Sequence, residues 1–328
     1  AITATKFVTL VGRHAGGAIN HADADGTVAM GYQAGASITT GRYNTAIGYE
    51  TLKTTTEMDY NTALGYQALK VASGSAGTGE NTAIGYLAGT ANTSGFRNTL
   101  VGAYAGNSLT TSFTNTLIGT RAGTTLSTGA NNIAVGYGAM YQSTTSNTNV
   151  VIGNDAMYYG NAAALYNVVI GHSAGARMAN VAAGRNVYIG NNAGYNATGS
   201  YNTFLGYEAG KGGTGAAPYS SGQYNVALGA YAFDSFTTGD DNCIIGRSAG
   251  HQISTGDYNV CLGSMAGDNL TTGANNTYLG YNSDCSANSV NDEIVLKAGS
   301  DTLVGGGTET IRIGVDSDYI VNDFGENA

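Results

Sequence analysis

The stretch Asn61-Thr62-Ala63-Leu64-Gly65 contains the pattern that decides the fold. Its order of asparagine, β-branched residue, apolar residue, large aliphatic residue and glycine returns along most of the 328-residue chain. Sixteen glycines anchor these copies: Gly12, Gly31, Gly48, Gly65, Gly85, Gly102, Gly119, Gly136, Gly153, Gly171, Gly190, Gly206, Gly229, Gly246, Gly263 and Gly280. Nine of the fifteen intervals between them are 17 residues long, and the others range from 16 to 23. In fourteen copies asparagine stands four residues before the glycine, and in fourteen alanine stands three residues after it, so the chain is an internal repeat.

A repeat of about 17 residues with glycine and asparagine at fixed places is typical of one coil of a parallel β-solenoid, or β-roll. Two strands of about five residues and two turns would fill each coil. We therefore predict an all-β fold of about 16 coils over residues 1–284. Within the motif, the period of two places Thr45 and Ile47 on one face and Ala46 and Gly48 on the other. Because the Ile47 position is large and apolar in every copy, we expect that face to fill the interior.

The asparagine column suggests two structural roles. Asparagine tolerates the left-handed backbone that a tight corner needs, and stacked asparagine side chains can bond amide to amide along a column. The clearest members are Asn44, Asn61, Asn81, Asn98, Asn115 and Asn132. We interpret the column as structural rather than as a ligand site, and the glycine column as a corner or a place of close approach.

The opposite face of the same strands, which points away from the expected interior, is also apolar. It includes Ala46, Ala63, Ala83, Leu100, Leu117, Val151, Val169, Tyr188, Phe204, Ile244 and Tyr278. A strand that is apolar on both faces is buried on both faces. A column of such residues at about 4.8 Å per coil makes a stripe roughly 75 Å long, more than a soluble monomer usually exposes. We therefore expect a parallel homotrimer with these residues packed at its threefold axis.

Copies such as Asn44-Thr45-Ala46-Ile47-Gly48-Tyr49 resemble the repeats of phage tail fibres and similar trimeric fibres. They are also similar to the left-handed β-roll heads of trimeric autotransporter adhesins, whose shorter coils carry an Asn-Ser-Val-Ala-Ile-Gly signature, and to the mosaic adhesive trimers of predatory bacteria. The likeness covers roughly residues 5–284. It implies an extracellular attachment fibre, on a virion tail or a bacterial cell surface.

The repeat ends after Gly280. Residues 285–328 contain two other strand-like runs, Glu293-Ile294-Val295-Leu296 and Thr310-Ile311-Arg312-Ile313-Gly314. A solenoid needs a cap, because its last coil exposes unpaired strand edges. We predict that residues 285–328 form a separate small β cap or tip.

The composition excludes several classes of protein. With 51 glycines and one proline, the chain is neither a helical bundle nor collagen. The 13 Lys and Arg against 22 Asp and Glu give a net charge of −9, which argues against nucleic acid as a partner. No run of 18 apolar residues occurs, so we expect no membrane insertion. The three cysteines make no disulfide framework, and Cys243 and Cys261 should point to opposite faces.

The sequence offers little for catalysis or metal binding. The four histidines are far apart and share no coil with a Ser-Asp arrangement. The acidic stretches His21–Asp25 and Asp240-Asp241 could hold a cation, but a solvated loop is the simpler interpretation. We therefore expect no catalytic residues, no metal and no cofactor.

Tyrosine is the better indication of binding, with 23 residues against 7 phenylalanines. Tyrosines that directly follow the anchoring glycine could stack along the fibre, or could offer ring faces to sugars beside neighbouring hydroxyl-bonding groups. The longer connections contain our candidate ligand contacts, since binding residues concentrate on loops. These candidates are Tyr158, Tyr159, Tyr166, Lys211, Tyr219 and Tyr224.

Together, these features predict a non-catalytic trimeric fibre or adhesin that attaches to a cell surface, through glycans, at its loops or C-terminal tip. Repetition sets length and rigidity, and three copies give avidity. Two alternatives remain open at this stage: a purely structural fibre shaft, and a tailspike-like polysaccharide depolymerase with two carboxylates flanking a groove. An ice-binding solenoid is a further option, but it would need a regular threonine array, and threonine is lost from copies such as Asn167-Val168-Val169.

Overall fold

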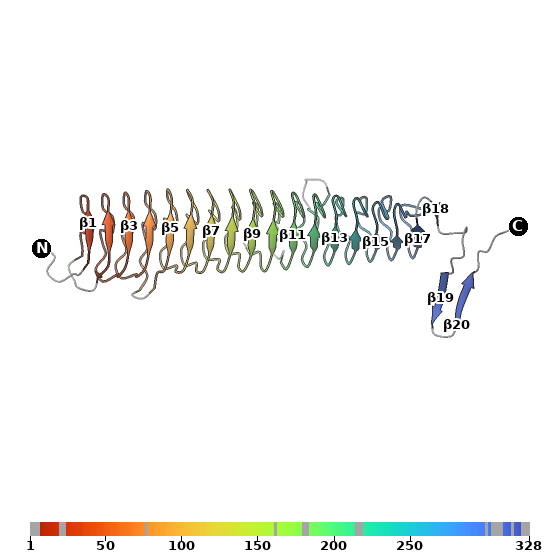
Figure 1. Cartoon of the computed structure of the whole chain (residues 1–328), viewed down its shortest axis with the longest axis horizontal. Helices are drawn as coiled ribbons and strands as arrows, with labels where there is room; N and C mark the ends of the chain where they lie inside the picture. The colour runs from red at the N-terminus through yellow and green to blue at the C-terminus, as the bar shows by residue number, and fades with distance from the viewer. Residues whose placement is uncertain are drawn as a thin grey trace.

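A computed structural model of the chain describes residues 7–19, 24–75, 78–160, 163–178, 184–213, 219–298, 301–302, 311–315 and 318–322. Over these ranges the chain forms a long stack of coils that runs from β1 to β17 (Figure 1). The described part consists of strands and turns and has no α-helix. The predicted all-β solenoid of about 16 coils is confirmed.

Each coil contributes one strand to a single sheet. The strands are β1 (Thr9–Val11), β2 (Val28–Met30), β3 (Thr45–Ile47), β4 (Thr62–Leu64), β5 (Thr82–Ile84), β6 (Thr99–Val101), β7 (Thr116–Ile118), β8 (Ile133–Val135), β9 (Val150–Ile152), β10 (Val168–Ile170), β11 (Val187–Ile189), β12 (Thr203–Leu205), β13 (Val226–Leu228), β14 (Cys243–Ile245), β15 (Val260–Leu262), β16 (Thr277–Leu279) and β17 (Ile294–Ala298). Neighbouring strands pair in parallel and in register, so that Ala46 lies between Ala29 and Ala63. The expectation of two five-residue strands per coil is wrong, because the return path of each coil is built from turns.

Left-handed residues bend this return path at fixed places in the coil. One stands directly before the asparagine, as Tyr43 does (φ 55°), and another stands two residues after the glycine, as Glu50 does (φ 51°). Their backbone N–H groups donate to the carbonyl groups of the preceding coil, Tyr43 to Asp25 and Glu50 to Tyr32, both at 2.9 Å. The coils therefore stay hydrogen-bonded to one another outside the sheet, which satisfies the backbone of the turns.

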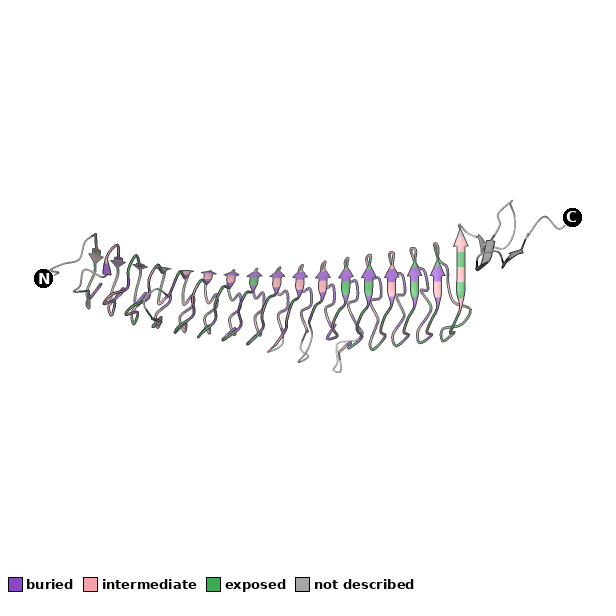
Figure 2. Ribbon diagram, turned by 90° about the horizontal axis from the view of Figure 1, so that it is seen from below, coloured by how far each residue is buried: buried purple, intermediate pink, exposed green. Residues whose placement is uncertain are grey.

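The two faces of the strands are the reverse of our prediction. The residues that we expected at a trimer axis are 0% exposed inside their own coil: Ala46, Ala63, Ala83, Leu100, Leu117, Val151, Val169, Tyr188, Phe204, Ile244 and Tyr278. The residues on either side of them in each strand are exposed or half-buried, seen as green and pink on the arrows in Figure 2. Leu64, for example, is 42% exposed. The reason is that the coil is thin. Its interior accepts a small strand residue such as Ala46 because a larger side chain, Leu52, enters from the return path of the same coil.

Beside the buried alanine three residues after the glycine, three sites in each coil supply core side chains whose size varies. They are the middle residue of the strand and the residues four and seven positions after the anchoring glycine, which we call the strand, plus-four and plus-seven sites. In the coil of β2, Gly35 at plus-four leaves room for Ile38 at plus-seven, whose Cδ1 lies 2.9 Å from where a Cβ of residue 35 would be. In the coil of β3 the sizes are exchanged, with Leu52 at plus-four and Thr55 at plus-seven, both 0% exposed. The core volume is therefore shared among the three sites.

The asparagine column forms a buried ladder. The Oδ1 of Asn98 accepts hydrogen bonds from the backbone N–H (3.0 Å) and the side-chain Nδ2 (3.1 Å) of Asn115. The Nδ2 of Asn115 also donates to the carbonyl of Gly129 across the coil, at 3.0 Å. The same contacts recur at Asn44, Asn61, Asn81, Asn98, Asn115 and Asn132. The ladder thus joins each coil to its neighbours and ties the strand to the return path, while the left-handed corner belongs to the residue before the asparagine.

The anchoring glycines are both corners and places of close approach. Gly102 has φ +131°, and a Cβ at that position would lie 2.6 Å from the carbonyl carbon of Gly119 in the next coil. A larger residue would therefore push two coils apart and strain the backbone.

The stack continues past residue 284, where we expected a separate cap to begin. β17 pairs in parallel with β16, with Leu296 opposite Leu279, and the backbone N–H of Glu293 donates to Oδ1 of Asn276 at 2.9 Å. Beyond it, β18 (Asp301–Thr302) pairs antiparallel with β17, and β19 (Ile311–Val315) pairs antiparallel with β20 (Asp318–Asn322). The first strand-like run is therefore a further coil of the solenoid.

Candidate functional site

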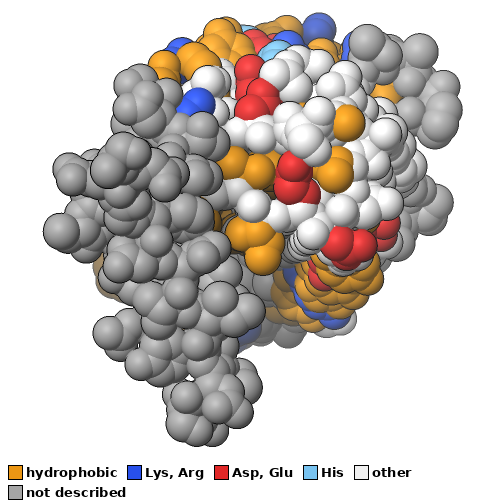
Figure 3. Space-filling view, turned by 90° about the vertical axis from the view of Figure 1, so that its right-hand side faces the viewer, with side chains coloured by type: hydrophobic (Ala, Val, Ile, Leu, Met, Phe, Trp, Pro, Cys, Tyr) orange, Lys and Arg blue, Asp and Glu red, His pale blue; other side chains and the backbone are white. Residues whose placement is uncertain are grey.

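The outer face of the sheet is a continuous apolar strip. The residues before and after the buried strand residue are threonine, valine, isoleucine or leucine in nearly every coil. Exposed members include Ile118 (38%) and Leu262 (43%). Seen along the stack, hydrophobic side chains of successive coils lie one behind another (Figure 3). The strip spans 16 intervals between 17 strands, roughly 77 Å at the usual strand spacing.

Aromatic columns lie beside this strip. Directly after the anchoring glycines, Tyr32, Tyr49, Tyr66 and Tyr86 stack with ring centroids 5.1–5.2 Å apart. The stacked arrangement that we considered for these tyrosines is therefore present over four coils. On the other side of the strands, before the asparagines, Tyr43 stacks on Tyr60 at 5.2 Å.

The column before the asparagines also contains two of the candidate ligand contacts. The guanidinium of Arg185 lies over the rings of Tyr166 and Tyr201, 5.5 and 5.3 Å from their centroids, and Tyr201 stacks on Tyr224 at 4.9 Å. Tyr166 and Tyr224 thus belong to one mixed tyrosine–arginine column rather than to independent loops.

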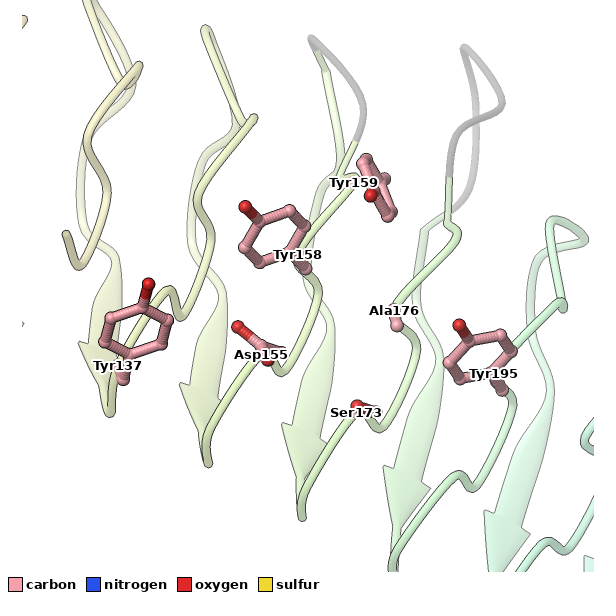
Figure 4. A pocket seen from close by; sticks show the side chains of 7 residues that line it. All are labelled: Tyr137, Asp155, Tyr158, Tyr159, Ser173, Ala176 and Tyr195. Atoms are coloured by element: carbon pink, nitrogen blue, oxygen red, sulfur yellow. The ribbon is translucent and has the colours of Figure 1, made fainter.

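A groove with an aromatic lining opens on another edge of the solenoid, over the coils of β8 to β11. Its volume is about 360 Å³, and Tyr158 and Tyr159 from our candidate set contribute to it (Figure 4). The lining residues all lie on turns and return paths: Tyr137, Asp155, Tyr158, Tyr159, Ser173, Ala176 and Tyr195. Tyr158 stacks on Tyr141 at 4.7 Å and meets Tyr159 edge-on at 4.8 Å. Partial burial raises the pKa of Tyr158.

The remaining candidates, Lys211 and Tyr219, lie further along the stack. The ammonium group of Lys211 is 2.8 Å from a carboxylate oxygen of Glu208. The Arg177 guanidinium lies over the ring of Tyr219 at 5.6 Å and over Tyr195 at 5.2 Å. Lys211 also lines a second groove of about 510 Å³, with Asn196, Gly212, Gly213, Asp234, Ser235 and Thr237.

Several titratable side chains are paired with other groups of the solenoid. His251 Nδ1 lies 2.6 Å from an Asp234 carboxylate oxygen, and burial raises the pKa of Asp234. The carboxylate of Asp240, which we weighed as a cation ligand, accepts a hydrogen bond from the backbone N–H of Gln223 at 2.7 Å. All three cysteines are free, with Cys243 on the outer face and Cys261 in the interior. His21 and Asp23 lie outside the described residues.

The described ranges hold no group of three or more His, Cys, Asp or Glu side chains arranged to bind a metal ion. Nor do they contain a helix with the length and apolar character needed to cross a bilayer.

The structure therefore places the six sequence-predicted contacts apart: Tyr158 and Tyr159 at the aromatic groove, Tyr166 and Tyr224 in the tyrosine–arginine column, Lys211 at the second groove, and Tyr219 across Arg177 from Tyr195. Tyr158 and Tyr159 share the aromatic groove, whose other members Asp155, Ala176 and Tyr195 our sequence reasoning missed. Aligning the copies on their glycines would have found them, because Tyr158, Ala176 and Tyr195 each stand five residues after an anchoring glycine.

No protein-family model matches the chain, and neither the curated proteins nor the solved structures include a significant match. The surface of the solenoid itself therefore provides the indications of function.

Proposed function

We propose that the chain is one subunit of an extracellular fibre, made of three parallel chains, that attaches to a cell surface. The observation that carries this proposal is the apolar strip on the outer face of the sheet. It is long and continuous, has no charged residue in any strand from β1 to β16, and is longer than the apolar patch of a typical monomer.

The occupant that best fits this strip is another copy of the same chain. Its side chains repeat at every coil, so a partner can match it over its full length only if it has the same spacing. Identical strips meet around one axis in a cyclic assembly. The residues at this axis would be Ile118, Leu262 and their equivalents, in place of the interior residues that we first assigned there.

The attachment function is supported by the rest of the surface. Aromatic columns and grooves are repeated on a rigid rod, and three copies multiply weak contacts through avidity. In this proposal the chain binds and does not catalyse, and its ligands are surface glycans.

The assembly is tested by light scattering on the purified chain and on Ile118→Lys. The wild type should have the mass of three 33.2 kDa chains, about 100 kDa. Because Ile118 is exposed on the single chain, the variant should fold but lose the trimer. Thr111→Lys is the matched control, since Thr111 is exposed on the return path and should leave the trimer intact. A wild-type monomer in dilute buffer would refute the assembly.

Attachment is tested with fluorescent protein on a glycan array and on cells with defined surface polysaccharides. Retention of the trimer, and much weaker retention of the Ile118→Lys monomer, is the expected result. Failure of the trimer to bind any glycan or cell would leave the chain as a structural shaft. Release of reducing ends from a polysaccharide would instead identify a depolymerase.

A further inference from the structure

The apolar strip has two flanks that differ in sequence. The residues directly before the asparagines form one of them, which we call the asparagine flank. The residues directly after the anchoring glycines form the other, which we call the glycine flank. In the coil of β14 these residues are Asp241 and Arg247, six positions apart on either side of the strand. At about 3.3 Å per residue the separation is about 20 Å, so the two flank residues of one coil are too far apart to pair with each other.

Cyclic symmetry decides which flanks meet between chains. Three parallel chains that turn their strips toward one axis form a triangular prism, and each corner of the prism joins one chain to the next. Because all three chains point the same way, every corner brings the asparagine flank of one chain against the glycine flank of its neighbour. Rotation about the axis involves no shift along it, so residues of the same coil meet at the same height. An antiparallel pair would instead place like flanks together.

The coil of β14 carries opposite charges on its two flanks. Asp241 and Arg247 are both exposed, and neither forms an ion pair within the described residues. The residues next to them along the flanks are tyrosine, alanine and serine, which offer no charge. A neighbouring chain of a parallel assembly would present the opposite charge to each of them at the same height.

The other charged residues of the asparagine flank already have partners in their own chain. Over the fourteen coils from β3 to β16 this flank carries four Asp, Glu, Lys or Arg residues, and the glycine flank carries one, Arg247. Glu80 and Arg97 pair with each other at 2.7 Å, and the Arg185 guanidinium lies over two tyrosine rings. Asp241 is the fourth. The acid left over on one flank and the base on the other therefore fall in the same coil.

The aromatic residues of the flanks match in a similar way. The coils of β3, β4 and β12 have tyrosine on both flanks. In the coil of β12, Tyr201 is 42% exposed and Tyr207 is 45% exposed. Rings that meet at a corner would remove this apolar surface from water. One corner thus joins aromatic to aromatic in some coils and acid to base in another.

We propose that the two flanks bind each other between chains, coil by coil, and that an ion pair between Asp241 of one chain and Arg247 of the next sets the register of the parallel assembly. The proposal rests on the proposed function and names the contact that aligns its subunits. A shift by one coil would place Asp241 opposite Ala230 or Ser264 and leave both charges unpaired. The return paths, with their two grooves, stay outside the corners and open to ligands.

The first test is zero-length crosslinking with a carbodiimide, which joins a carboxylate to an amine only when the two are in contact. Arg247→Lys supplies the amine and keeps the charge. Covalent dimers and trimers joined through residues 241 and 247 should appear on a denaturing gel, and mass spectrometry of the digested protein should identify the link. The matched control is Asp241→Asn/Arg247→Lys, which lacks the carboxylate and should lose this link.

The second test reverses the charges and follows chain exchange between labelled and unlabelled trimers. Asp241→Arg should exchange chains at least about tenfold faster than the wild type, since three ion pairs become three like-charge contacts in each trimer. Asp241→Arg/Arg247→Asp restores opposite charges at every corner and should recover most of the loss. Glu57→Arg makes the same change in net charge at an exposed place on the return path, and should exchange chains as the wild type does.

Two outcomes overturn the contact between flanks: a stable Arg247→Lys trimer in which residues 241 and 247 do not crosslink, or equal exchange rates for Asp241→Arg and the wild type. Light scattering on the same samples separates this proposal from the proposed function. A wild-type trimer combined with either of those outcomes rejects the contact and keeps the assembly. A crosslinked dimer of parallel chains keeps the contact and rejects the trimer, and a wild-type monomer rejects both.

Discussion

Two stretches of the solenoid fill their interiors in different ways. From β2 to β4 the strand site is always alanine, and most of the volume comes from the return path, through Ile38, Leu52 and Leu69 respectively. At β11 and β12 the strand site holds Tyr188 and Phe204, which stack at 5.1 Å. In those two coils the plus-four site is glycine, and a Cβ on Gly194 would lie 2.6 Å from the Tyr188 ring.

The difference teaches that the large core side chain can come from the strand in one coil and from the return path in another. Close packing tolerates neither a void nor an excess. A coil can therefore exchange an aromatic residue on the strand for an aliphatic residue on the return path without changing the hydrogen-bonded frame. The stability of each coil should depend on whichever site is large in that coil.

Removing a ring from the aromatic stretch should have the largest effect. Phe204→Ala leaves a cavity that neither Gly210 nor Ala197 can fill, and should lower the free energy of unfolding by about 3–5 kcal/mol. Phe113→Ala is the matched control: this ring is 39% exposed and stacks on Phe96 at 5.3 Å, so its loss should cost about 1 kcal/mol. Urea denaturation measures both. Equal losses would show that the interior ring has no special role.

Exchanging the two return-path sites tests the comparison directly. Leu52→Gly empties the core of the β3 coil and should cost about 2–4 kcal/mol, since the loss of the side chain is partly offset by relief of its left-handed backbone. Leu52→Gly/Thr55→Leu gives this coil the Gly-and-aliphatic arrangement of Gly35 and Ile38, and should recover most of the loss.

The double variant should regain stability for a second reason. Thr55→Leu also removes the buried Thr55 hydroxyl, which has no hydrogen-bond partner in the described part of the chain. Thr55→Leu alone serves as the control, and it should destabilise by overpacking beside Leu52. If the losses of the two single variants simply add in the double variant, the sites do not share one volume.

The repeat, the parallel stack and the hydrogen-bonding ladder were predictable because the Asn61 and Gly65 columns keep a strict spacing. Which face of the strand is buried was not predictable, because Ala63 and Leu64 are both apolar. A period of two assigns neighbouring residues to opposite faces but does not indicate which face lies in the interior. Size misled us, since Leu64 is larger than Ala63 but the interior is narrow. A better signal was available: Ala63 shares a face with Asn61, whose amide ladder has to be shielded from water.

The aromatic groove was only half predictable. Tyr158 and Tyr159 stood out as an aromatic pair, whereas Ala176 and Asp155 are unremarkable residues in a sequence. Their place in the groove follows from the stacking of coils, which brings residues 18 or more positions apart to within one ring spacing.

The charged residues of the same two stretches make a smaller contrast. Glu50 and Glu208 occupy equivalent places two residues after the glycine, and each pairs with a lysine three residues later. Glu50 contacts a second lysine, Lys70, at 2.9 Å, and its hydrogen bonds to Lys53 and Lys70 lower its pKa to about 2. Burial of the Glu208 carboxylate acts to raise its pKa, but the hydrogen bonds from Lys211 and Tyr207 act more strongly in the other direction. The pKa of Glu208 is therefore lowered.

Glu50→Gln should therefore cost about 1 kcal/mol at pH 7, after allowance for the partly solvated lysines, and Glu208→Gln should cost less. Because the folded pKa of Glu50 lies below its usual 4.5, this stabilisation is complete above about pH 4.5 and is lost as the pH falls toward 2. Urea midpoints of wild type and variant should converge over that window. A constant difference from pH 7 to pH 2 would assign the loss to packing rather than charge.

A further contrast concerns two buried tyrosines at the same strand site. The Tyr278 hydroxyl donates to a Glu293 carboxylate oxygen at 2.9 Å. The Tyr188 hydroxyl has the Asn202 amide for a neighbour but forms no well-aligned hydrogen bond within the described residues, and burial raises the pKa of Tyr188 well above its usual range. Tyr278→Phe should thus remove a charge-assisted hydrogen bond and lower the free energy of unfolding by about 1–2 kcal/mol.

At residue 188 the same change removes a hydroxyl that was desolvated without compensation, so Tyr188→Phe should raise the free energy of unfolding by up to about 1 kcal/mol. Both variants are compared with wild type in one set of urea melts, and retained near-ultraviolet circular dichroism checks that the rings stay packed. A loss at residue 188 would mean that its hydroxyl finds a partner in solution, and the aromatic stretch would then depend on hydrogen bonding as well as on volume.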